Sequence, residues 1–166
     1  MSGERLDPEW VRGWCVRTSA ALDALMSSFP RTRGFPPDEN AVTLATDESH
    51  GATDALVDLT PIPSDLTTLY WVVREVSMPD VEHGYFVHPA SKVAEHFRAY
   101  GPVRIIEDEP TAIVFASDGG GCLFAVAGSG RVWKSTTASW FDDFEVVAES
   151  VQDFLEEIGR RAAGRN

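Results

Sequence analysis

The sequence has few basic residues and no long run of apolar ones. It contains 14 Lys and Arg against 26 Asp and Glu, a net charge of -12. This shortage of cations opposes binding to nucleic acid and to an anionic membrane surface. No apolar run approaches the ~18 residues of a membrane span, and Met1–Pro8 lacks the apolar core of a secretion signal. We therefore expect a cytosolic protein that binds neither nucleic acid nor membrane.

The chain also has little cysteine. It holds Cys15 and Cys122, which form no Cys-x-x-Cys pair, and we expect both to be buried free thiols. A chain of 166 residues buries roughly 70% of the surface that its unfolded form exposes, so it needs no disulfide or metal to fold. Its 43% hydrophobic content is ordinary for globular proteins. We predict a single domain over residues 1–166.

Motifs for catalysis and cofactor binding are missing as well. There is no Gly-x-Ser-x-Gly elbow. The glycine-rich segment Asp118–Gly121 lacks the Gly-Lys-Ser/Thr ending of a phosphate loop and precedes a strand pattern, so it predicts a hairpin turn. No two histidines have the His-x-x-x-His spacing of a zinc site, although His83 and His88 flank one short strand and could approach each other. We predict no catalytic, metal or cofactor site.

The first apolar pattern that is present indicates a long helix. Asp7 is a suitable N-cap and Pro8 suits the first helical position. Apolar side chains then recur at the spacing of one helix face. They are Trp10, Val11, Trp14, Cys15, Ala21, Leu22, Leu25, Met26 and Phe29. Pro30 is predicted to end the helix, and we expect its tryptophans to lie in the core.

Residues 31–61 show little periodicity. They contain Phe35-Pro36-Pro37, scattered Thr and Asp, and a weak strand pattern at 41–45. Such a composition is typical of a loop. We predict a long connection with at most one short strand and one short helical piece, and we expect it to be the most mobile part of the chain.

From residue 63 onward, helix and strand patterns alternate. Helices are predicted to begin at Ser64, after Pro89 and after Ser150. Strands are predicted at 84–88, 103–107, 112–117, 122–127 and 131–135. Short Gly-rich links join the last three strands, and such links suit hairpins and leave no room for crossover helices. We predict an α+β fold whose central, mainly antiparallel sheet has about five or six strands, with a frayed tail at 160–166.

Acidic residues dominate the end of this pattern. Seven acids and no Lys or Arg fall between Ser139 and Gly159, and three more acids precede the strand at 112–117. The ten acids are Glu107, Asp108, Glu109, Asp142, Asp143, Glu145, Glu149, Asp153, Glu156 and Glu157. A run of this kind is often a solvated face, but it would also attract and dock a basic protein. We take these acids, together with Trp140, as candidate partner-binding residues.

Two features near this acidic run leave alternatives open. Trp133, Trp140 and Phe141 are of the type that anchors interfaces, and they could equally lie in the core. Asp142 and Asp143 are adjacent, and neighbouring carboxylates usually point apart, which opposes paired acid–base catalysis. Capping or partner binding is the better interpretation of this pair.

The order of motifs from Pro61 to Ile158 resembles the SUKH superfamily, the Smi/Knr-type domains. The resemblance rests on a Pro-led second helix, a central strand that begins at a glycine, two glycine turns that flank a Phe-Ala-Val strand, and a closing helix of the Ala-x-Ser-x-x-x-Phe-Leu kind. The matching segments are Ile62–Leu66, Gly84–Pro89, Asp118–Val126, Gly130–Trp133 and Val147–Leu155.

This resemblance implies an α+β fold and a non-enzymatic role. Bacterial members are mostly immunity proteins that neutralise toxins, often nucleases, whereas eukaryotic members are regulatory scaffolds. The Gly, Ala, Arg and Asp usage is typical of a bacterium of high GC content. We therefore expect a protein-binding, immunity-type domain whose partner is a basic toxin. A regulatory protein of the same fold is the alternative, and a small hydrolase that uses Asp142, Asp143 or His88 is a third.

Overall fold

A computed structural model describes residues 6–106, 109–141 and 143–164. Within these residues the chain forms five helices and an eight-stranded, mainly antiparallel sheet, so the predicted α+β fold is confirmed. The helices are α1 (Pro8–Arg33), α2 (Asp47–Leu59), α3 (Ser64–Val72), α4 (Ala90–Tyr100) and α5 (Val151–Ala162). The strands are β1 (Ala41–Leu44), β2 (Val73–Met78), β3 (Tyr85–Val87), β4 (Val103–Ile106), β5 (Glu109–Asp118), β6 (Leu123–Ala127), β7 (Val132–Ser135) and β8 (Phe144–Ala148).

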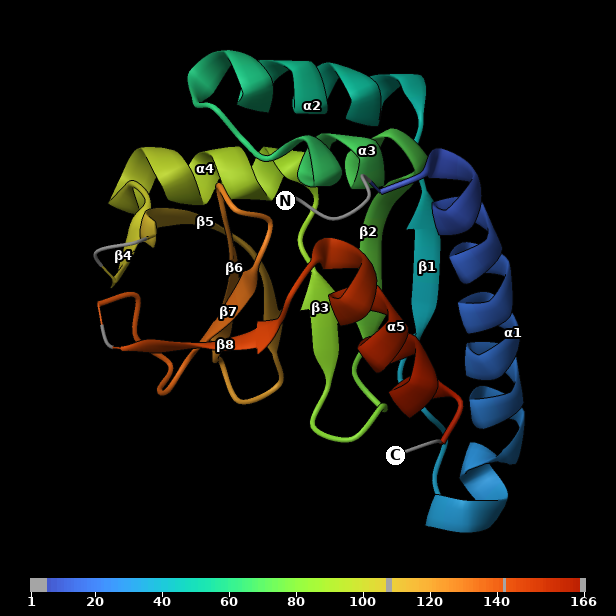
Figure 1. Ribbon diagram of the computed structural model, residues 1–166. Coiled ribbons are helices and arrows are strands. Elements are labelled where there is room, and N and C mark those ends of the chain that lie inside the picture. The colour runs from blue at the N-terminus through green and yellow to red at the C-terminus, as the bar shows by residue number, and fades with distance from the viewer. Residues whose placement is uncertain (1–5, 107–108, 142, 165–166) are drawn as a thin grey trace.

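The long strand β5 joins the two halves of the sheet. The strand order is β1-β2-β3-β5-β6-β7-β8. Strand β3 pairs with the end of β5, and β4 pairs with its beginning. The half made of β4 to β8 curls round on itself, and β8 ends this half as an edge strand (Figure 1).

Alternation along β5 and β6 divides the buried residues into two cores. Ile113 and Phe115 of β5 face the helices and join the main core, while Ala112 and Val114 face the opposite side and join a smaller second core. Strand β6 alternates in the same way. The members of the second core are Val103, Ala112, Val114, Ala125, Ala127, Trp133 and Phe144. Three of these seven are alanines, whose small side chains suit the inside of a tight curl.

Helix α5 covers the main core on the helical side. Ser150 accepts a hydrogen bond from the N–H of Asp153 and caps the helix, as predicted. Phe154 packs its ring 5.5 Å from that of Phe115 on β5. Helix α1 then packs on α5, where Trp14 Nε1 donates to the carbonyl of Leu155 at 2.7 Å. The predicted core position of Trp14 is therefore confirmed.

The prediction that Pro30 ends the first helix was wrong. Helix α1 continues through Pro30 to Arg33. Pro30 lies in the last turn and its side chain is exposed, so its ring meets solvent. Its carbonyl accepts from Gly34, which has the left-handed φ of +80° that ends the helix.

Residues 31–61 hold more regular structure than the sequence suggests. They include β1 and the 13-residue helix α2, which is longer than the short helical piece expected. A capping box at Thr46 and Ser49 starts α2. At the other end of the chain, Arg160 and Arg161, expected in the tail, lie within α5.

The sheet has two strands beyond those predicted. Strand β2 begins directly after α3, so no Gly or Pro marks the change from helix to strand. Strand β8 has three consecutive exposed residues and therefore lacks the alternation typical of a half-buried strand.

Glycine is required at position 119 by a close backbone approach. The loop that precedes β3 packs against the turn after β5, and Gly119 N–H donates to the Gly84 carbonyl at 3.2 Å. A Cβ at position 119 would lie 1.6 Å from the His83 carbonyl oxygen. The two segments can therefore touch because residue 119 has no side chain.

Gly119→Ala should destabilise the protein by about 2 kcal/mol or more, because the loop or the turn must move to relieve the clash. Gly128→Ala is the matched control, since a Cβ there meets nothing within 4 Å. Urea unfolding of both variants would check this. Equal midpoints for the two would contradict the close approach.

Candidate functional site

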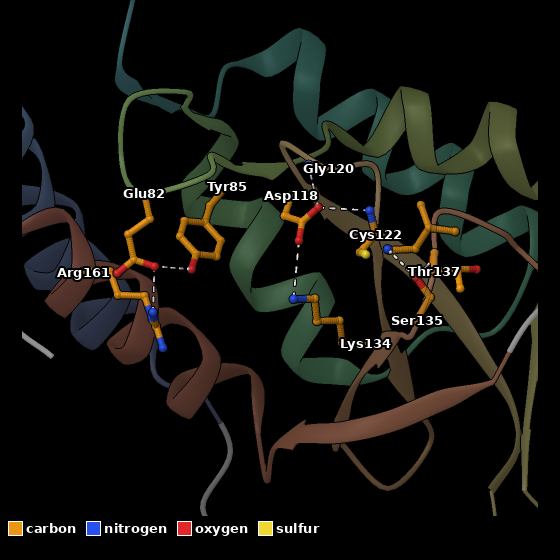
Figure 2. A network of polar contacts seen from close by, with 10 residues as sticks. Glu82, Tyr85, Asp118, Gly120, Cys122, Lys134, Ser135, Thr137 and Arg161 are labelled. Atoms are coloured by element: carbon orange, nitrogen blue, oxygen red, sulfur yellow. Dashed lines mark hydrogen bonds and ion pairs between the residues drawn. The ribbon is translucent and has the colours of Figure 1, made fainter.

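The glycine-rich turn after β5 is closed by the carboxylate of Asp118. Figure 2 shows this network, in which Asp118 Oδ1 accepts from the N–H groups of Gly120 and Cys122 at 2.9 Å each. Lys134 Nζ lies 3.4 Å from the other oxygen of the carboxylate. The amides that might have bound a phosphate are thus occupied by the protein's own anion. The predicted hairpin turn is confirmed.

Several acids of the predicted binding surface pair with the protein's own arginines. Glu149 lies 3.3 Å from Arg131, and Glu156 lies 3.9 Å from Arg160. Glu157 accepts from Arg160 at 2.7 Å and from Arg161 at 2.8 Å. These hydrogen bonds, Arg160 first, hold the pKa of Glu157 below its ordinary value against the opposing effect of burial. The acidic run is therefore partly neutralised along α5.

The other acids of the run differ in their surroundings. Asp153 is exposed in the first turn of α5, where the helix dipole favours a negative charge. Asp143 and Glu145 are exposed beside and on β8, and neither makes an ion pair with any described residue. Glu107, Asp108 and Asp142 lie outside the described residues. So does the side chain of Glu109, whose backbone belongs to β5.

Exposed apolar side chains accompany Asp143 and Glu145. Phe141, in the loop before β8, is 82% exposed, and Val146 and Val147 on the strand are 44% and 45% exposed. Lone exposed apolar residues are common. Three within seven positions lie around this edge strand together with two described acids, a mixture of apolar and charged side chains of the kind found at interfaces. We call Phe141, Asp143, Glu145, Val146 and Val147 the β8 surface.

An aromatic pocket adjoins this surface at Phe141. It has a volume of about 590 Å³, and Tyr100, Trp140 and Phe141 contribute its aromatic walls, with Arg104 of β4 also lining it. Trp140 is half-buried, and its ring centroid lies 5.0 Å from that of Tyr100. The structure thus brings Trp140 next to the β8 surface. Trp133, close by in sequence, lies instead in the second core.

His88 is a buried histidine that forms a hydrogen bond with a serine. Its Nε2 lies 2.8 Å from Ser117 Oγ, and its Nδ1 has no hydrogen-bond partner among the described residues. A serine nucleophile needs a base that is itself oriented by a third group. Of the residues that the structure describes, none supplies that group. His88 therefore links the end of β3 to β5.

His88 does not meet His83, which lies exposed in the loop before β3. Its ring neighbour is His96 of α4, with centroids 5.7 Å apart. No cluster of three or more His, Cys, Asp or Glu able to hold a metal ion occurs within the described parts of the chain. Cys15 is buried, which raises its thiol pKa to about 11, whereas Cys122 is half-buried.

Sequence reasoning did not identify Tyr100, Val146 or Val147 as surface residues. A signal for the two valines existed in the missing alternation after Phe144.

None of the described helices is long and apolar enough to cross a membrane. A scan against protein-family models finds no match to this chain, and a search of curated proteins also finds none.

Burial makes His88 a determinant of acid stability. Burial, with smaller contributions from Lys92 and His96, lowers the pKa of His88 to about 4. The unfolded chain binds this proton near the ordinary pKa of about 6.5. Between these two values the unfolded state holds more protons, so the stability from the neutral ring is complete above about pH 6.5 and is lost as the pH falls toward 4.

Between pH 7 and pH 4.5, the free energy of unfolding should therefore fall by roughly 2 kcal/mol less in His88→Gln than in the wild type, because glutamine binds no proton. Denaturant unfolding at a series of pH values would measure this, with His83→Gln as the exposed control. A wild-type pH slope in His88→Gln would refute the assignment.

Proposed function

We propose that this chain is a non-enzymatic protein-binding domain of the immunity type, which neutralises a cognate bacterial toxin by binding it through the β8 surface. The observation that carries the proposal is the exposure of Phe141, Val146 and Val147 beside two unpaired acids. The resemblance to the SUKH superfamily supports the same class of function. The β8 surface is smaller than the predicted acidic surface, because Glu156 and Glu157 of α5 are engaged by arginines and Asp153 lies in the first turn of that helix.

Charge supports a basic partner. The whole chain carries -12, and the field of such a protein speeds encounter with a cationic one. Of the described cations near β8, Arg131 pairs with Glu149 and Lys134 with Asp118, while Arg104 lines the pocket beside Phe141, and none of the three pairs with Asp143 or Glu145. Asp143 and Glu145 are therefore left to meet lysines or arginines of the partner. Many nuclease toxins are basic, and an acidic inhibitor suits them.

The aromatic pocket favours a contact in which a side chain of the partner is buried as an anchor. Large aromatic side chains and arginine dominate the binding energy of known interfaces. Here Phe141 projects beside a cavity walled by Trp140 and Tyr100, which is large enough for a side chain of a partner. We expect an apolar side chain of the toxin to enter the pocket while its basic residues meet the acids of the β8 surface.

The direct experiment is to capture, with the purified chain, any toxin domain encoded beside this gene, and the absence of such a gene would count against the proposal. Tight, stoichiometric binding that abolishes toxin activity is the expected result. Failure of that toxin domain to bind would remove the proposal. Binding of a basic protein that is not a toxin would favour the regulatory alternative.

Neutralising Asp143 and Glu145 should weaken the complex mainly by lowering the association rate constant. In Asp143→Asn/Glu145→Gln we expect the affinity for that toxin domain to fall about tenfold, with a weaker dependence on salt. Surface-plasmon measurements at several ionic strengths would show both effects.

The matched control is Asp54→Asn/Asp58→Asn, which makes the same change in net charge on exposed positions of α2. Helix α2 lies at the top of Figure 1, and α4 lies between it and β8 in this view. The control should stay within about twofold of wild type, because local complementarity matters more than net charge. Equal losses in both variants would show that the β8 acids make no specific contact.

Phe141→Ala should weaken binding by roughly thirtyfold, in line with loss of an aromatic anchor worth about 2 kcal/mol. Its side chain is 82% exposed, so the melting temperature should stay unchanged. Calorimetric titration and a thermal melt together would test this. An affinity equal to wild type would exclude Phe141 as an anchor.

A further inference from the structure

We propose that the open edge of β8 takes up an extended, basic segment of the protein partner as an additional strand of the sheet. The inference rests on the proposed function, that the chain binds a protein at the β8 surface. It adds a mode of recognition in which backbone hydrogen bonds give affinity and alternating side chains give specificity.

The register of β8 leaves backbone groups free at this edge. Thr136 N–H donates to the Asp143 carbonyl, and Ser135 is opposite Phe144. In an antiparallel ladder, hydrogen-bonded and non-hydrogen-bonded pairs alternate. Glu145 therefore directs its N–H and C=O toward β7, whereas Phe144 and Val146 direct theirs away from it. Strand β8 has no neighbour on that side among the described residues.

A β-bulge marks the end of this free edge. Val132 is opposite Ala148 while Trp133 is opposite Val146, so Val147 is the extra residue. The segment from Phe144 to Val146 remains regular. It offers two N–H and two C=O groups, which suits an added strand of about four residues.

Side chains specify the chemistry of the added strand. Successive residues of a strand point to opposite faces. Glu145 lies on one face, and Phe144 and Val146 lie on the other. An incoming strand would therefore carry Lys or Arg opposite Glu145 and apolar side chains opposite Phe144 and Val146. The exposed Asp143 adds a second contact for a basic residue at the start of β8.

Charge disfavours a second copy of this chain as the occupant. Antiparallel self-pairing that used the free groups of both Phe144 and Val146 would set Glu145 directly opposite Glu145 of the other copy. Like charges in that position are destabilising, and each copy carries -12. The opposite edge of the sheet, β1, contains no charged residue and offers no preference for a basic strand.

The experiment uses Val146→Pro in the full chain, with the toxin domain encoded beside the gene as the probe. Proline removes the outward N–H at position 146, and an edge strand tolerates it because this N–H has no partner within the sheet. Val146→Thr is the matched comparison, since it also changes the side chain but keeps the N–H and the branched shape. A thermal melt of each variant confirms that the fold is retained.

The expected result is an affinity of Val146→Pro that lies about tenfold or more below that of Val146→Thr, because only the proline lacks the outward N–H. As a second measurement, hydrogen exchange at the Val146 amide of the wild-type chain should slow on binding. This measurement tests the proposal even if Val146→Pro does not fold.

Wild-type affinity in a folded Val146→Pro, or unchanged exchange at Val146, would overturn strand addition while the proposed function stands. A wild-type chain that does not bind the toxin domain would overturn both. Self-association lost in Val146→Pro would identify a second copy as the occupant and would overturn the basic segment.

Discussion

The alternation of side chains along β5 is the constraint on which the rest of the structure depends. The strand has ten residues and borders β3, β4 and β6. Ile113 and Phe115 must face the helices, so Ala112 and Val114 must face the other way. A slip of one residue would exchange the two sets and place small residues under α5. Both cores are thus fixed by one strand.

The curl of the sheet follows from this division, and the candidate surface follows from the curl. Trp133 and Phe144 fill the inside of the curled half, where Trp140 packs against the same core with Tyr100 of α4 beside it. Because β8 is the last strand of the path, its outer edge faces solvent, with Phe141 and Trp140 at the rim. The same geometry that buries Phe144 leaves its neighbours Glu145 and Val146 accessible to a partner.

Local signals in the sequence predicted the parts of the fold that are set by local chemistry. Asp7 and Ser150 cap their helices as expected, and the glycine turns form hairpins. Strand β2 was missed because the apolar pattern of α3 continues into it without a break. The ion pair of Arg131 with Glu149 joins residues far apart in the sequence. The ion pair of Glu157 with Arg161 has the i, i+4 spacing of a helical pair, but it was missed because residues 160–166 were expected to fray.

The most direct test of the central claim is a map of the binding surface. The backbone amide signals of the isotope-labelled chain would be followed by nuclear magnetic resonance during titration with the unlabelled toxin domain. The account predicts that the largest changes fall at residues 141 and 143–147 and that α2 stays unchanged. Changes centred on α2, or on α1 and α5, with β8 unaffected, would contradict it.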